Sequence, residues 1–166
     1  MTDTQRIKRR KWLVLLTFLI VIAIAAAIFL FSSESGEESN ATSLGFAKLY
    51  LRVFHPDYDS LPEAEQAALL IQAQYTVRKT AHFLEYAALG FFLRLFLYGI
   101  RLPHPLAFVL TLLLGAGYAG FDEYHQYLVG TRTAMWQDVA LDSAGVLFGL
   151  LIATLVVARR VRKKRR

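Results

Sequence analysis

Four long apolar blocks constrain the fold of this chain more than any other feature of its sequence. They lie at residues 12–31, 81–100, 104–121 and 139–158. An α-helix rises about 1.5 Å per residue, so roughly 20 apolar residues cross the hydrocarbon core of a bilayer. The third block is short and would need local thinning of the bilayer. The pattern predicts an all-α protein, an integral membrane four-helix bundle with one membrane domain at residues 12–158.

The segment at residues 32–77 separates the first two blocks and is expected to form a mostly helical loop. Its stretch ATSLGFAKLYLRVF has apolar residues on most faces and suits a short helix at the membrane surface. A second loop helix is expected to begin with Ser60 as its N-cap and Pro62 in its first turn. This helix is predicted to continue into the second apolar block.

Positive charge is concentrated in residues 1–11 and in the tail at residues 159–166. Because cytoplasmic segments of membrane proteins are rich in Lys and Arg, we expect both termini in the cytoplasm. That orientation puts about 14 cations and one acid inside, and the other 12 acids outside with the loop. A basic tail on a hydrophobic chain favours membrane lipids as partners and argues against nucleic acid.

The first apolar block follows a basic segment, as the apolar region of a signal peptide does. Its apolar run is about twice the usual length for a signal peptide, so an uncleaved membrane helix is favoured. The chain contains no cysteine, which excludes disulfides and thiolate metal sites.

Ionisable side chains from three of the apolar blocks are expected to meet on the outer side of the membrane. Helical spacing places Tyr75, Arg78, His82 and Glu85 on one face. The end of the third block and the start of the fourth add further polar groups, namely Asp122, Glu123, His125, Gln126, Asp138 and Asp142. Charges at membrane depth are costly unless they are paired or hydrated. The sequence therefore predicts a polar pocket that opens outward.

The residue types suggest roles within this pocket. The candidates for acid–base catalysis are His82, Glu85, Asp122 and Glu123. The candidates for ligand binding are Arg78, Lys79, Gln126, Arg132, Asp138 and Asp142. A divalent metal, if one binds, would have as ligands His82, Glu85, Asp122 and Asp138. For Asp142 the alternative is a structural ion pair with Arg78 or Lys79.

Small residues predict close helix packing beneath the pocket. Gly145 and Gly149 are four residues apart and continue the helix face of Asp138 and Asp142. Two further pairs of small residues, Gly115/Ala119 and Ala116/Gly120, occur on the third block. Such small-xxx-small pairs allow membrane helices to approach closely.

The same residues resemble the signature of the VanZ-like family of bacterial membrane proteins. The matching segments are FSSESGEES (31–39), RKTAHFLEYAALG (78–90), DEYHQYLVGTR (122–132) and QDVALDSAGVLFG (137–149). By this resemblance, the residues that occupy the characteristic positions of the family are Lys79, His82, Glu85, Asp122, Glu123, Gln126, Arg132, Asp138 and Gly145. Asp142 stands where the family often has asparagine. The resemblance implies a bacterial plasma-membrane protein of the cell envelope, linked to low-level resistance to the glycopeptide teicoplanin.

Two classes of function remain open from the sequence. In the first, the pocket binds the polar headgroup of a lipid-linked cell-wall intermediate or of the lipid-anchored target zone of teicoplanin, and a glycopeptide is the alternative partner. In the second, the protein is an enzyme at the membrane face, an acid–base or metal-assisted hydrolase or transferase acting on a lipid-linked phosphate or an envelope glycan. The spacing His82-x-x-Glu85 is only a weak metal motif. A transporter subunit is a third class, for which no sequence feature argues.

Overall fold

The computed structural model describes residues 3–34, 36–128 and 135–165. These residues form α1 (Asp3–Ser32), α2 (Gly36–Phe54), a 3₁₀ turn η1 (Tyr58–Ser60), α3 (Glu63–Gly99), α4 (His104–Leu128) and α5 (Trp136–Arg165). No strand occurs in any of the described ranges. The predicted all-α class is therefore confirmed.

Four of the helices are long and apolar enough to cross a membrane. The candidate spans are Ile7–Ser32, Glu63–Gly99, His104–Leu128 and Trp136–Arg159. Each contains most or all of one expected apolar block, so the prediction of a four-helix membrane bundle is confirmed. Helix α4 continues seven residues past the apolar block that ends at residue 121. Its full length of 25 residues is enough to cross a bilayer without the expected thinning.

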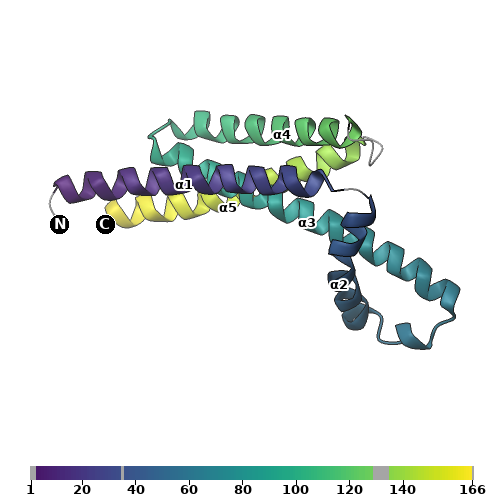
Figure 1. The fold of residues 1–166 in the computed structure, drawn as a ribbon. Coiled ribbons are helices and arrows are strands. Elements are labelled where there is room, and N and C mark those ends of the chain that lie inside the picture. Colours follow the sequence, from purple (N-terminus) through teal and green to yellow (C-terminus); the bar gives the residue numbers. More distant parts are fainter. Residues whose placement is uncertain (1–2, 35, 129–134, 166) are drawn as a thin grey trace.

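Helix α3 is the central element of the bundle, because it packs against each of the other four α-helices. Its most extensive pairing is with α5. The start of α1 and the end of α5 lie at one end of the bundle, and the end of α4 and the start of α5 lie at the opposite end (Figure 1). We refer to these as the terminal end and the connection end.

The loop between the first two spans is helical and projects from the connection end (Figure 1). Helix α3 has 37 residues and is therefore about 55 Å long, more than the hydrocarbon thickness of about 30 Å. Its N-terminal part leaves the bundle and packs against α2 through Ala47, Leu51 and Ala73. The predicted mostly helical loop is confirmed.

The start of α3 differs from the expected cap. Pro62 occupies the N-cap position and Glu63 is the first helical residue. The Ser60 hydroxyl instead donates to the carbonyl oxygen of Asp57 at 2.7 Å, within the 3₁₀ turn. The predicted N-cap at Ser60 was therefore wrong, because the turn formed by residues 58–60 uses that hydroxyl.

Glycines bring the backbones of α3 and α5 into direct contact. A Cβ atom on Gly145 would lie 2.5 Å from the carbonyl oxygen of Phe83, and one on Gly149 would overlap the carbonyl oxygen of Ala87. The predicted close packing at Gly145 and Gly149 is confirmed. On α4, a Cβ atom on Gly115 would meet the Val146 side chain at 2.5 Å.

The last predicted pair of small residues on α4 has a different environment. A Cβ atom on Gly120 would meet nothing within 4 Å. The expectation that Gly120 packs closely was therefore wrong, because the space beside this position is open.

Candidate functional site

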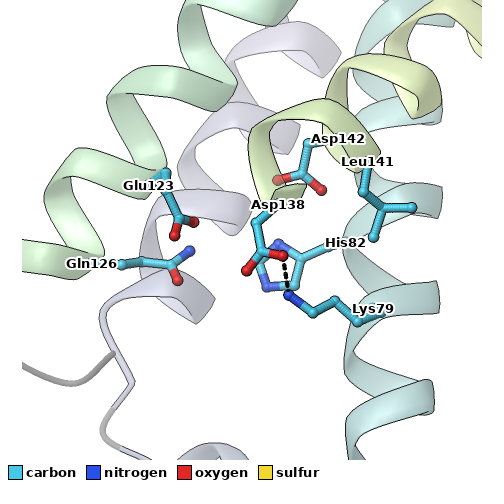
Figure 2. A pocket seen from close by; sticks show the side chains of 7 residues that line it. All are labelled: Lys79, His82, Glu123, Gln126, Asp138, Leu141 and Asp142. Atoms are coloured by element: carbon cyan, nitrogen blue, oxygen red, sulfur yellow. Dashed lines mark ion pairs between the residues drawn. The ribbon is translucent and has the colours of Figure 1, made fainter. Parts of the chain in front are cut away.

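A polar pocket lies at the connection end of the bundle, between α3, α4 and α5. Its lining residues point toward one another from these three helices (Figure 2). They are Lys79, His82, Glu123, Gln126, Asp138, Leu141 and Asp142. The empty volume, counted with the open mouth, is about 230 Å³. This figure includes open solvent and the enclosed part is much smaller, so the pocket suits a small group such as an ion or part of a headgroup.

The mouth of the pocket contains an ion pair between Lys79 and Asp138 (Figure 2). Both side chains are partly exposed, and ion pairs in such positions stabilise proteins by only about 0–1 kcal/mol. The pair therefore contributes more to the position of two charged groups than to stability. The Lys79 ammonium also lies 5.3 Å from the centre of the Tyr75 ring.

Asp122 lies deeper and is held by side chains from two helices. The Ser32 hydroxyl donates to Oδ2 of Asp122 at 2.8 Å, and the Gln126 amide donates to the same oxygen at 3.1 Å. The Gln126 amide also donates to the Ser32 hydroxyl at 3.2 Å. Asp122 is only 1% exposed, and its Oδ1 is buried with no hydrogen-bond partner in the described part of the chain.

Three of the buried or half-buried side chains could hold a metal ion. His82, Asp122 and Asp142 each offer one ligand atom, and these atoms all lie within 4.8 Å of one another. The three residues come from α3, α4 and α5. The set expected from the sequence contained His82 and Asp122, but with Glu85 and Asp138 in place of Asp142.

Glu123 connects the pocket wall to the start of α5. Its Oε1 accepts a hydrogen bond of 2.7 Å from the backbone N–H of Met135. The carbonyl oxygen of Met135 in turn accepts a hydrogen bond of 2.9 Å from the backbone N–H of Asp138. Glu123 is therefore placed to position the first turn of α5, which contributes Asp138 and Asp142 to the pocket.

Other predicted site residues lie away from this pocket or outside the described residues. Glu85 is half-buried on α3 but is not among the lining residues. Arg78 hydrogen-bonds the side chain of Asn40 on α2. The His125 ring packs on Phe29 with a distance of 4.4 Å between ring centres. Arg132 falls in the segment 129–134, outside the described residues.

Sequence reasoning missed Ser32, which ends α1 and contributes its hydroxyl to Asp122. Ser32 directly follows the first apolar block and belongs to the FSSESGEES segment, which was the available signal. The interpretation of Asp142 as the ion-pair partner of Lys79 differs from the structure, in which Lys79 pairs with Asp138. Residue spacing alone does not distinguish two aspartates that lie one turn apart.

Comparison with known proteins yields one result. No curated protein and no solved structure matches the chain. A family model described as VanZ/LLP1 matches residues 16–157, a range that includes all four candidate spans in whole or large part and every pocket-lining residue. This multi-pass membrane protein therefore belongs to the VanZ/LLP1 family.

Proposed function

We propose that this chain is a cell-envelope protein of the bacterial plasma membrane whose pocket binds the polar headgroup of a lipid-linked cell-wall ligand. The observation that supports the proposal is the pocket at the connection end, which is lined by charged residues from three helices. Because the VanZ-like resemblance implies a link to teicoplanin, we also propose that the protein contributes to tolerance of glycopeptide antibiotics such as teicoplanin.

The proposed orientation places the connection end outside the cytoplasm. The basic segments at residues 1–11 and 159–166 belong to the terminal end. Segments next to membrane helices that are this rich in Lys and Arg remain on the cytoplasmic side. The pocket would then face the compartment in which cell-wall intermediates are exposed.

The pocket offers both signs of charge to a headgroup. The Lys79 ammonium is suited to a phosphate oxygen, and the carboxylates of Asp138 and Asp142 accept hydrogen bonds from sugar hydroxyls or amines. Exposed leucines such as Leu113 and Leu114 on α4 suit contact with acyl or prenyl chains. A lipid-linked phosphate combines these two kinds of group.

The grouping of His82, Asp122 and Asp142 supports a second candidate, an enzyme acting on the same class of lipid. An imidazole beside carboxylates is suited to proton transfer, and a bound metal would polarise a phosphoryl oxygen. Incubation with a polyprenyl diphosphate separates the two candidates. Release of inorganic phosphate by the native chain, lost in His82→Gln, identifies an enzyme, and absence of release identifies a binding protein.

The Lys79→Gln variant tests headgroup binding. Loss of a charge-assisted hydrogen bond costs about 1.5–3 kcal/mol, so we expect affinity for a polyprenyl phosphate to fall about tenfold or more. Binding is measured by native mass spectrometry in detergent, and teicoplanin susceptibility is measured in cells that make each variant at equal membrane levels. Cells with Lys79→Gln are expected to be as susceptible as cells lacking the protein.

The matched control is Lys48→Gln, which removes an exposed cation of α2 outside the pocket. It is expected to retain both binding and tolerance. The proposal is overturned if Lys79→Gln binds the lipid and protects cells as well as Lys48→Gln does.

A further inference from the structure

We propose that His82, Asp122 and Asp142 bind a divalent transition-metal ion of the Zn²⁺ or Mn²⁺ class. The inference concerns the pocket of the proposed function and rests on it for the role of the ion, which is to bind the phosphate of the headgroup. Binding of the ion itself can be measured without any lipid.

The geometry of the three side chains is close to that of a bound ion. Metal–nitrogen and metal–oxygen bonds of about 2.0–2.2 Å allow two ligand atoms to be at most about 4.4 Å apart. The atoms of His82, Asp122 and Asp142 lie within 4.8 Å of one another. A small movement of the side chains therefore completes the coordination.

A second observation is the buried oxygen of Asp122. Its Oδ2 accepts hydrogen bonds from Ser32 and Gln126, whereas its Oδ1 has no hydrogen-bond partner among the described residues. Buried polar atoms without partners are rare, because they lose water without gaining a donor. An ion bound by Oδ1 would satisfy this atom. Ser32 and Gln126 would then orient the ligand in the way that outer hydrogen bonds orient metal-binding carboxylates.

The charge of the group also favours a divalent cation. Asp122 is 1% exposed and Asp142 is 5% exposed, so two carboxylates lie close together away from water. The neighbouring ammonium of Lys79 is paired with Asp138 at the mouth. An ion of charge +2 neutralises both buried carboxylates, and a neutral imidazole completes the set without adding charge.

The donor atoms indicate which ions fit. One imidazole and two carboxylates suit Zn²⁺, Mn²⁺ or Fe²⁺, whereas Ca²⁺ requires six to eight oxygen ligands. Three protein ligands leave at least one coordination position open. His82 and Asp142 line the pocket, so a phosphate oxygen of the proposed ligand would reach that position from there.

The helix packing holds the ligands in place. The backbone of Gly145 leaves no room for a Cβ atom beside the carbonyl oxygen of Phe83, the residue that follows His82, and Asp142 lies one turn before Gly145. The backbones that bear His82 and Asp142 are therefore in direct contact. A site on such rigid elements is preorganised for its ion.

The experiment uses the full chain purified in detergent, stripped with a chelator and reloaded with Mn²⁺ or Zn²⁺. We expect one ion per chain by elemental analysis and a higher unfolding temperature in the loaded protein. With Mn²⁺, pulsed electron paramagnetic resonance should show coupling to one imidazole nitrogen, and that coupling should be absent in His82→Gln. Asp122→Asn is expected to bind the ion at least tenfold more weakly.

The matched control is Glu65→Gln, which removes an exposed carboxylate in the first turn of α3, outside the group. It should retain the ion with the affinity of the native chain. Folding is checked without metal: Asp122→Asn should unfold at or above the temperature of the native chain, because one of two close buried carboxylates is neutralised. Only its stabilisation by metal should be lost.

The outcomes separate this inference from the proposed function. A chain that binds Mn²⁺ or Zn²⁺ through these residues but no polyprenyl phosphate supports the metal site and overturns headgroup binding. If the chain takes up neither metal and binds the lipid equally well with and without chelator, the metal site is overturned. Headgroup binding is then still supported. Uptake of metal that Asp122→Asn and His82→Gln do not weaken also overturns the site.

Discussion

At the scale of single residues, the orientation of Asp122 depends on a hydroxyl from a helix 90 residues earlier in the chain. Ser32→Ala removes that donor in a buried setting, so we expect the free energy of unfolding to fall by about 1–2 kcal/mol. Metal affinity should fall about tenfold, because Asp122 loses one of the groups that orient it. Unfolding in detergent and metal titration measure the two effects.

The neighbouring Ser33→Ala is the matched control, since the Ser33 hydroxyl donates to the carbonyl oxygen of Phe29 in the last turns of α1. It should change stability by no more than about 0.5 kcal/mol. Equal effects of the two variants would contradict the role given to Ser32. The comparison also shows a limit of sequence reasoning: Ser32 and Ser33 are identical in type and adjacent, and only the three-dimensional contact with Asp122 distinguishes them.

At the scale of helices, contact between α3 and α5 positions the pocket. Gly145→Ala would place a Cβ atom 2.5 Å from the carbonyl oxygen of Phe83, so α5 must move away from α3. We expect a loss of about 1–3 kcal/mol in stability, typical of overpacking, together with weaker metal binding.

The control Gly117→Ala adds a Cβ atom that meets nothing within 4 Å. It should stabilise α4 by up to about 1 kcal/mol, and destabilisation equal to that of Gly145→Ala would contradict the packing argument.

Hydropathy predicted the number of membrane helices and their order but not their full length. The third apolar block ends at residue 121 because Asp122 and Glu123 lower the hydropathy, yet α4 continues to Leu128. Both acids are buried in the bundle, and the helix continues past them. Hydropathy measures only how polar a residue is. It does not distinguish a polar side chain facing other helices from one facing water.

At the scale of the whole molecule, polar groups occupy both ends of the bundle in different ways. At the terminal end the buried Arg94 donates toward Thr154 and contacts Nδ1 of His104 at 3.0 Å, while Arg10 donates to the carbonyl oxygen of Gly99 at the end of α3. Cations at a helix C-terminus interact favourably with its dipole. The charge pattern in the sequence predicted which end is basic. It did not predict that Arg94 is buried, because this burial depends on contacts with Thr154 and His104 on two other helices.

The proposed orientation can be tested directly, because the sequence contains no cysteine and a single introduced thiol has no background. Asp57→Cys lies in the loop and Lys8→Cys near the N-terminus, and both positions are exposed. In intact cells or spheroplasts, a membrane-impermeant maleimide should label Asp57→Cys and not Lys8→Cys, because the basic segments are retained in the cytoplasm. After permeabilisation both should be labelled to the same extent, which controls for reactivity. If only Lys8→Cys were labelled in intact cells, the bundle would have the opposite orientation and the pocket would face the cytoplasm. This result would overturn the proposed role at the outer surface.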